Sequence, residues 1–243
     1  MTDEDLAAQL ADGAGKLLLA LREGPFATDA GLGAIADKAA NSFILTALAE
    51  WRPGDAVLSE ECPDNPARTA NPRCWIIDPL DGTREYGEGR SDWAVHVALS
   101  VDGRPAIGAV ALPALGRLYR SDGPPAVAPD RERPVIAVSR TRPPEIALAI
   151  AAELDAELRE MGSAGAKAMA VVGGEADLYV HAGGQHQWDN CAPAAVALGL
   201  GLHASRIDGA PLAYNGADTN VPDLVIGRRD LAERAIEFIT GRR

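Results

Sequence analysis

The spacing of hydrophobic positions predicts two helices at the start of the chain. Between residues 5 and 21 the apolar positions Leu6, Leu10, Leu17, Leu18 and Leu21 are consistent with one face of an amphipathic helix. Residues 24–33 contain Gly and Pro and are expected to form a loop. A second apolar pattern covers residues 34–51 and is stopped by Pro53-Gly54.

Short apolar runs then predict strands. These runs lie at residues 56–58, 74–77, 93–99, 106–112 and 117–120. Residues 62–73 are polar and are expected to form a surface loop, and Asp102-Gly103 indicates a tight turn.

Strand and helix patterns alternate in the second half of the chain. Strands are expected at 135–139, 177–181 and 224–227, and helices at 144–158, 164–172, 189–200 and from about 230. Residues 121–133 are rich in Pro and charge. We therefore predict an N-terminal α+β half (1–126) and a C-terminal α/β half (127–243).

Composition limits the class of protein. With 243 residues, 47% of them hydrophobic, and a mean hydropathy of −0.06, a soluble globular protein is expected. No apolar stretch is long enough for a membrane span, the acidic N-terminus does not have the layout of a signal peptide, and three cysteines favour a reduced cytoplasm. A net charge of −12 argues against a nucleic-acid polymer as partner. A small phosphorylated substrate would need local positive charge from metal ions or basic side chains.

The most informative segment is the predicted strand 74–77 and the residues after it. It ends at Asp78, Pro79 has no N–H to extend a ladder, and Asp81 follows three residues after Asp78. Two ionised carboxylates this close repel each other unless a cation lies between them, and Mg²⁺ prefers oxygen ligands. An ordinary turn of Asp, Pro and Gly is the competing interpretation.

A second acidic pair strengthens the metal interpretation. The apolar run 56–58 leads into Ser59-Glu60-Glu61, so two strand ends bear acids that can meet at one sheet edge. Gly82-Thr83 offers backbone N–H groups and a hydroxyl, which suit a phosphate if a helix begins there.

Ser59-Glu60-Glu61, the segment 75–83 and Trp188-Asp189 together resemble motifs of the inositol monophosphatase superfamily of Mg²⁺-dependent, Li⁺-sensitive phosphatases. The resemblance extends from about Asp37 to the end of the chain. It implies a layered α-β-α-β-α sandwich of the inositol monophosphatase and fructose-1,6-bisphosphatase type, two or three Mg²⁺ ions, and a possible homodimer.

The resemblance also implies roles for individual residues. The implied metal ligands are Glu60, Asp78, Leu80 (through its carbonyl), Asp81 and Asp189. Asp189 would also serve as a helix cap, which by itself would explain an Asp there. Glu61 is either a partner that orients a ligand or a solvated acid.

Asp37 and Thr83 are the implied catalytic pair, in which the carboxylate polarises the hydroxyl and the hydroxyl orients a water. From the sequence alone, Asp37 fits an ordinary exposed acid, and the segment 33–37 departs from the family pattern. One metal ion is expected to activate the water, and another to stabilise the leaving oxygen.

Three features resemble the CysQ-type 3′(2′),5′-bisphosphate nucleotidases. Arg84-Glu85-Tyr86 follows Asp-Gly-Thr, residues 162–167 read Gly-Ser-x-x-x-Lys, and Ala182 stands where inositol-specific members carry Glu. Substrate contacts are expected from Gly82, Thr83, Arg84, Arg140, Gly162, Ser163 and Lys167. Arg140 is preferred to Arg142, and a solvated helix lysine is the alternative for Lys167.

The sequence therefore predicts a phosphomonoesterase that converts adenosine 3′,5′-bisphosphate, a by-product of sulfate assimilation, to AMP and phosphate. An inositol monophosphatase or fructose-1,6-bisphosphatase of the same fold is the first alternative. An inactive phosphonucleotide-binding protein is the second, and the presence of every candidate carboxylate speaks against it.

Overall fold

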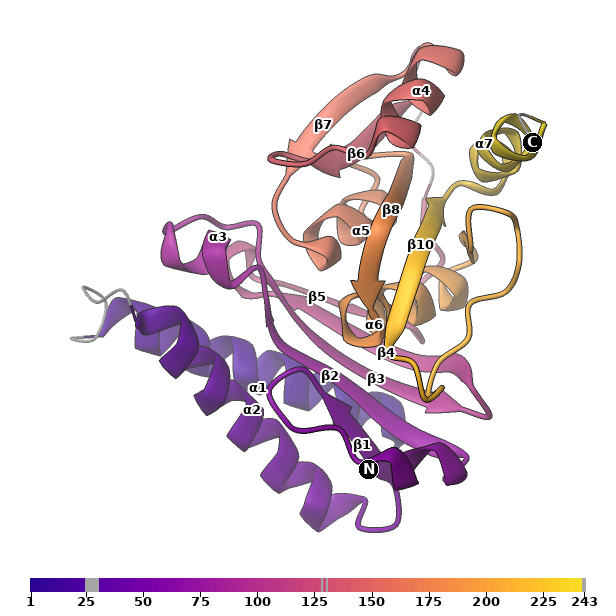
Figure 1. Ribbon diagram of the computed structural model, residues 1–243. Helices are drawn as coiled ribbons and strands as arrows, with labels where there is room; N and C mark the ends of the chain where they lie inside the picture. The colour runs from indigo at the N-terminus through magenta and orange to yellow at the C-terminus, as the bar shows by residue number, and fades with distance from the viewer. Residues whose placement is uncertain (25–30, 128, 130, 242–243) are drawn as a thin grey trace.

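The computed structural model describes residues 1–24, 31–127, 129 and 131–241 (Figure 1). Two long helices, α1 (Asp3–Glu23) and α2 (Leu32–Trp51), lie side by side along one face of the first sheet. Thr2 caps α1, because its hydroxyl accepts a hydrogen bond from the Asp5 N–H at 3.1 Å. Residues 25–30 of the predicted loop 24–33 lie outside the described residues.

The first sheet has the strand order β1-β2-β3-β4-β5. Its strands are β1 (Ala56–Ser59), β2 (Arg73–Asp81), β3 (Ala94–Val101), β4 (Arg104–Leu112) and β5 (Arg117–Arg120). β1 runs parallel to β2, so the acids that follow both strands lie at the same edge. The other pairs are antiparallel. Three short helical segments connect these strands: η1 (Pro66–Ala70), α3 (Thr83–Gly87) and η2 (Pro113–Leu115).

Alternation along β2 divides its side chains between two cores. Trp75 and Ile77 pack with α1 and α2, whereas Cys74 and Ile76 face the opposite side. All four are fully buried, as the continuous apolar run 74–77 predicts.

The second sheet has the order β7-β6-β8-β10-β9. Its strands are β6 (Val135–Ser139), β7 (Glu157–Met161), β8 (Leu178–His186), β9 (His203–Ser205) and β10 (Asn220–Gly227). Helices α5 (Ala164–Val172) and α6 (Gln187–Gly199) lie between the two sheets, and α4 (Glu145–Glu153) and α7 (Arg229–Thr240) cover the outer face.

Three buried clusters fill the spaces between these layers. One joins α1 and α2 to the first sheet, one joins both sheets through α5 and α6, and one joins the second sheet to α4 and α7. The predicted α-β-α-β-α sandwich is therefore confirmed. No described helix combines the length and apolar character needed to cross a membrane.

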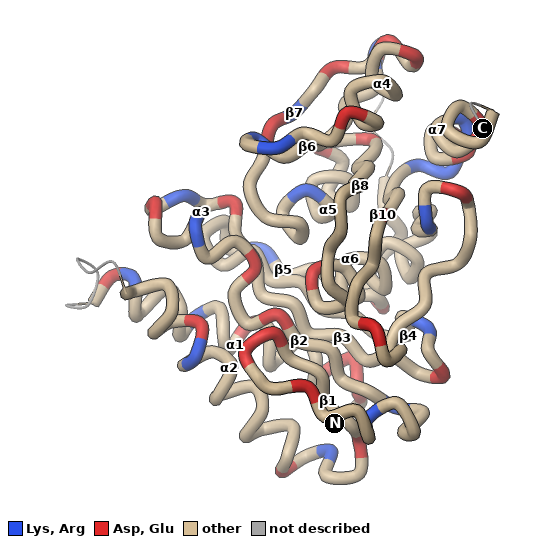
Figure 2. The backbone as a smooth tube through the Cα atoms, in the orientation of Figure 1, with Lys and Arg blue, Asp and Glu red and all other residues tan. Residues whose placement is uncertain are grey.

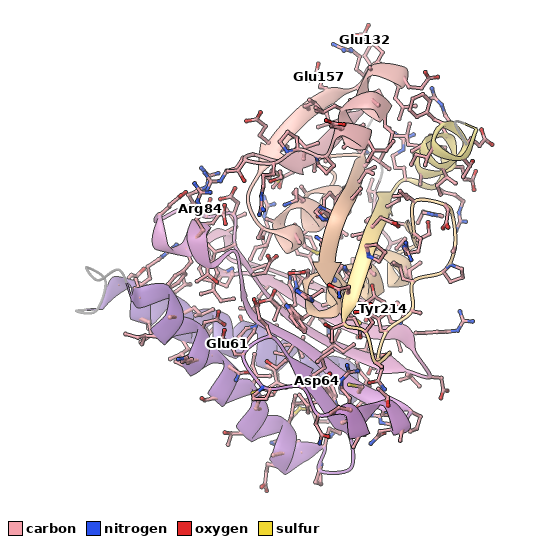
Figure 3. The ribbon with its side chains drawn as sticks, in the orientation of Figure 1. Glu61, Asp64, Arg84, Glu132, Glu157 and Tyr214 are labelled. Carbon is pink, nitrogen blue, oxygen red and sulfur yellow. The ribbon has the colours of Figure 1, made fainter. Side chains whose placement is uncertain are left out.

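The predicted helix at residues 144–158 is wrong at its C-terminal end. The helix ends at Glu153, Asp155 adopts a positive φ of 49°, and residues 157–161 form β7 beside β6. β7 is an edge strand with exposed charged positions such as Glu157 (Figure 3), so it lacks the apolar alternation that marks a buried strand. The three-residue strand β9 has no counterpart in the prediction, and β8 and β10 begin or end beyond the predicted runs.

The predicted boundary near residue 126 falls between β5 and β6, which belong to different sheets. Helix α6 nevertheless packs closely on the first sheet. A Cβ at Gly108 on β4 would lie 2.6 Å from the Ala192 carbonyl oxygen, so only glycine permits this approach. The two halves share one buried core, and their division stays a prediction.

Candidate metal and phosphate site

Acidic residues converge where the ends of β1 and β2 meet the beginning of α6 (Figure 2). Asp78, Asp81 and Asp189 each offer a carboxylate oxygen, and these three oxygens lie within 4.8 Å of one another. Glu60, which follows β1, is hydrogen-bonded to Asp78. The structure thus brings together the four predicted side-chain ligands.

The electrostatics of Asp78 and Glu60 reveal a shortage of positive charge. Burial raises the pKa of Asp78 far above its ordinary value, and the nearby Asp81 and Glu60 raise it further. Burial also raises the pKa of Glu60, with Asp81 and Glu61 adding to the shift. Without a cation, these carboxyl groups would hold protons rather than repel one another.

Asp81 has the opposite environment. Burial alone would raise the pKa of Asp81, but contacts with His96, the Gly165 N–H and Lys167 bring it below its ordinary value. The first backbone N–H groups of α5 bind this carboxylate, from Ala164 to Oδ1 at 3.2 Å and from Gly165 to Oδ2 at 2.6 Å. Asp81 therefore stays ionised.

Asp189 lies in the first turn of α6. It is the third helical residue and not the expected N-cap, which is His186, and its Oδ2 accepts a hydrogen bond from the His186 N–H at 2.5 Å. Burial and the neighbouring Asp81 and Glu60 raise the pKa of Asp189 to about 7. The same carboxylate belongs to the acidic cluster, so capping and metal binding are compatible.

Asp37 is buried in the first half of α2, rather than exposed as its local sequence would suggest. Burial, together with Glu61 and Glu60, raises the pKa of Asp37 to about 7, and a hydrogen bond with the Thr83 side chain opposes this shift. The Thr83 hydroxyl also lies 3.2 Å from the Leu80 carbonyl oxygen. The structure therefore brings Asp37, Thr83 and Leu80 into contact. Glu61 lies in the loop after β1 (Figure 3) and acts on Asp37 through its charge.

The turn after Asp81 depends on glycine. Gly82 has φ 90° and ψ 45°, in the left-handed region, and a Cβ there would lie 2.9 Å from the Ser163 Cβ. Gly82 leads into the short helix α3, whose N-terminus receives no side-chain cap in the described part of the chain. Backbone N–H groups of this turn therefore stay available to a ligand.

A cavity of about 450 Å³ opens beside the carboxylate cluster. Its lining includes Asp81 and Asp189 together with basic and polar side chains. The predicted contacts Gly82, Arg84, Gly162, Ser163 and Lys167 are all part of its lining. Arg84 stands on α3, at the outer rim (Figure 3).

Lys167 is buried on α5 and is not a solvated helix lysine. Its ammonium group donates to the carbonyl oxygens of Gly162 and Ser163, the latter at 2.7 Å, and lies 5.4 Å from the centre of the Tyr179 ring. Burial lowers the pKa of Lys167, and Asp81 and Glu85 oppose that effect. Since an ammonium group has three donors, one N–H remains for an anion in the cavity.

The N-terminus of α5 differs from the expectation of an open phosphate cradle. Gly162 N–H donates to Asp92 Oδ2 at 2.7 Å, and Ser163 N–H donates to the Asp92 carbonyl oxygen at 3.1 Å. The next two N–H groups bind Asp81, and Ser163 caps the helix at Ala166 N–H. This helix end therefore holds Asp81, and a substrate contact by Gly162 or Ser163 stays a prediction.

Arg142, and not the expected Arg140, lines the cavity. Arg140 binds Glu85 Oε1 at 2.9 Å through Nε and Glu88 Oε2 at 2.6 Å, and it is not part of the cavity lining. Arg142 lines the cavity and forms no ion pair with any carboxylate in the described ranges. The geometry thus favours Arg142 for an anion, against the sequence-based preference for Arg140.

Sequence reasoning missed several other residues of the cavity. Tyr179 and Gln185 come from β8, and Thr141 comes from the loop after β6. Only their proximity to Trp188-Asp189 in the sequence could have indicated the first two. Tyr214 is a buried core residue, and its hydroxyl donates to Asn190 Oδ1 at 2.8 Å.

Fold and site together define a layered α/β protein whose buried carboxylates and cations share one cavity. The model of the inositol monophosphatase family matches residues 4–238. The chain therefore belongs to the inositol monophosphatase family.

Its relatives include enzymes with defined names. The chain is 53% identical over 247 residues to the 3′-phosphoadenosine 5′-phosphate phosphatase of Mycobacterium leprae, covering 96% of this chain and 91% of the relative. It is 32% identical over 230 residues to the 3′(2′),5′-bisphosphate nucleotidase CysQ of Escherichia coli K12, and the alignment covers 86% of this chain and 93% of the relative. The crystal structure of CysQ from Bacteroides thetaiotaomicron superposes with a TM-score of 0.80 at 26% identity, and the superposition covers 93% of this chain and 97% of the CysQ chain.

Proposed function

We propose that this protein is a Mg²⁺-dependent 3′(2′),5′-bisphosphate nucleotidase that converts adenosine 3′,5′-bisphosphate to AMP and phosphate. The relatives at 53% and 32% identity carry the corresponding names. Their alignments span nearly the whole of this chain, including every residue from Asp37 to Asp189 that the site needs.

One observation carries the proposal. The cavity that contains Asp81 and Asp189 also contains Lys167 and Arg142, two cations with donors left for anions. A substrate with a single phosphate needs only the carboxylate cluster and the metal ions that it would bind. Two separate positive regions suit a substrate with two phosphates. Ala182 also lines this cavity and has no polar group to bind the hydroxyls of an inositol ring.

The residues fit a divalent metal. Oxygen donors converge from Asp78, Asp81, Asp189 and Glu60, and the raised pKa values of three of them show that the cluster lacks compensating charge. Hard cations such as Mg²⁺ take this donor set. When bound, such ions supply activation of water near neutral pH and stabilisation of the charge on the phosphoryl and leaving oxygens.

The chain's own residues then position and deprotonate the attacking water. The Thr83 hydroxyl donates to the Leu80 carbonyl at 3.2 Å, and turning it to Asp37 lets Oγ1 accept a hydrogen bond from water while its proton points to the carboxylate. The raised pKa of Asp37, about 7, suits a group that takes a proton at neutral pH. As the water oxygen bonds to phosphorus, the P–O3′ bond breaks, and one water proton passes by way of Thr83 to Asp37. The 3′-oxygen leaves with the bonding electron pair and takes a proton from solvent to become the hydroxyl of AMP, and Asp37 then returns its proton to solvent.

The test is a comparison of kcat/KM for three substrates with Mg²⁺: adenosine 3′,5′-bisphosphate, inositol 1-phosphate and fructose 1,6-bisphosphate. The bisphosphate nucleotide should have the highest value. If either sugar substrate is preferred, the nucleotidase assignment is wrong.

Asp81→Asn supplies the internal control. This variant should lose Mg²⁺-dependent phosphate release while remaining folded, because Asn keeps the shape and accepts one of the α5 N–H bonds. Unchanged turnover would remove Asp81 from the reaction. If the wild type binds the nucleotide tightly but releases no phosphate, it is a binding protein.

A further inference from the structure

His96 is a fully buried residue of β3 that the mechanism above does not use. Its ring joins the two metal-ligand segments. Nδ1 lies 3.0 Å from the Trp188 carbonyl oxygen, and Nε2 lies 3.2 Å from Asp81 Oδ2. Trp188 directly precedes Asp189, so this one ring touches both the end of β2 and the start of α6.

The partners of the two ring nitrogens of His96 determine where hydrogens on the ring are favourable. A carbonyl oxygen only accepts, so Nδ1 carries a hydrogen. The ionised Asp81 also only accepts, so a hydrogen on Nε2 makes this contact attractive. Nε2 forms no regular hydrogen bond in the part of the chain that the structure describes, and its polar contact is Asp81 Oδ2 at 3.2 Å.

The contacts of Asp81 limit the number of its oxygen lone pairs that can bind a cation. A carboxylate has about four acceptor positions. Oδ2 receives the Gly165 N–H and is covered by the His96 ring, whose Nε2 lies 3.2 Å away, and Oδ1 receives the Ala164 N–H. One position remains, on Oδ1. His96 and the start of α5 therefore leave Asp81 a single point at which to bind a cation.

The contact between His96 and Asp81 requires that residue 165 has no side chain. Its backbone has no positive φ that would itself demand glycine. A Cβ at this position would instead lie 2.1 Å from His96 Nε2 and 3.1 Å from Asp81 Oδ2. Any side chain at residue 165 would separate the imidazole from the carboxylate.

We infer that His96 is a positioning residue that holds Asp81 as a one-point metal ligand and ties it to the helix that carries Asp189. This inference rests on the proposed metal-dependent function but not on the identity of the substrate. Partners that orient a metal ligand are typically worth 10–100-fold in metal affinity. The effect is therefore predicted in metal binding, not in nucleotide recognition.

The experiment measures Mn²⁺ binding to the full metal-stripped chain by calorimetry, without substrate. In His96→Asn, the amide can replace Nδ1 as donor to Trp188 but does not reach Asp81. In His96→Gln, the longer amide can replace Nε2 as donor to Asp81. We expect the dissociation constant to rise about tenfold or more in His96→Asn and to stay within about threefold of wild type in His96→Gln. His203→Asn is the matched control, because His203 is another strand histidine whose Nε2 contacts only Ser205, at 2.8 Å.

Gly165→Ala is an independent variant that keeps His96 but displaces it, and it should weaken Mn²⁺ binding as His96→Asn does. With His96→Asn already present, the same alanine should weaken binding much less, because the shorter side chain leaves room for it. Wild-type Mn²⁺ affinity in either single variant would overturn the inference. So would a His96→Asn chain that fails to fold, or equal losses in Asn and Gln, since these results indicate a purely structural histidine. Loss of the nucleotidase activity alone, with Mn²⁺ affinities as expected, would count only against the proposed substrate.

Discussion

Asp189→Asn should stabilise the metal-free protein while abolishing its activity. The pKa of Asp189 rises from 3.8 to about 7 on folding, so at pH 8 its ionised form is destabilised in the native state. A shift of about 3 units at 1.36 kcal/mol per unit gives an upper limit of about 4 kcal/mol. Asparagine removes the charge and can still accept the hydrogen bond from the His186 N–H.

The sign of the pH dependence follows from proton linkage. Between pH 3.8 and about 7, the native state binds more protons at Asp189 than the unfolded state does, so stability falls as pH rises through this window. The penalty is complete above pH 7 and is reduced to about 2 kcal/mol at pH 5. The stabilisation by Asp189→Asn should therefore be about twice as large at pH 8 as at pH 5.

Urea unfolding in EDTA at both pH values measures this effect. Asp102→Asn is the matched control, because Asp102 is an exposed acid in a turn with φ 50°, a conformation that Asn tolerates. In saturating Mg²⁺ the advantage of Asp189→Asn should shrink or reverse, since bound metal stabilises only the native wild type. A variant no more stable than wild type in EDTA at pH 8 would refute the reasoning.

Three further changes test separate parts of the structure. Arg142→Gln should raise KM for the nucleotide bisphosphate roughly 10–100-fold, and Arg140→Gln should do so less, since Glu85 and Glu88 already bind it; equal effects in steady-state kinetics would contradict the cavity assignment. Thr83→Val should lower kcat at least about 100-fold with little change in KM, whereas Thr83→Ser should retain most activity; an active Val variant would exclude the hydroxyl relay. Gly108→Ala should lower the unfolding free energy by about 1–3 kcal/mol in urea, because its Cβ would overlap α6. An unchanged urea midpoint would show that α6 moves to accommodate the added Cβ.

Local patterns were sufficient for most elements and for the candidate acids Glu60, Asp78 and Asp81, whereas the expected role of Asp189 came from the family resemblance. Apolar periodicity identified the long helices and the buried strands, because burial on one face or both leaves a repeating pattern in the sequence. The acids after β1 and β2 were recognisable because each follows a buried strand directly. By contrast, β7 went unrecognised, since an edge strand needs few apolar residues.

The substrate side of the site was less predictable. Arg140 and Arg142 are two residues apart, and nothing in their local sequence distinguishes them. Glu85 and Glu88, more than fifty positions away along the chain, bind one and leave the other free. Gly162 and Ser163 do begin a helix as expected, but Asp92 and Asp81 occupy its N–H groups.

The sequence by itself determined most helices and strands and the candidate acids, since these depend on residue type and spacing within short segments, and the layered arrangement was expected from the family resemblance. Only the tertiary structure decided which polar group each side chain meets, because hydrogen bonds and ion pairs act over a few ångströms between segments far apart in the chain. His96 illustrates the difference. In the sequence it is one polar residue in an apolar strand, and in the folded protein it lies between Asp81 and the helix of Asp189.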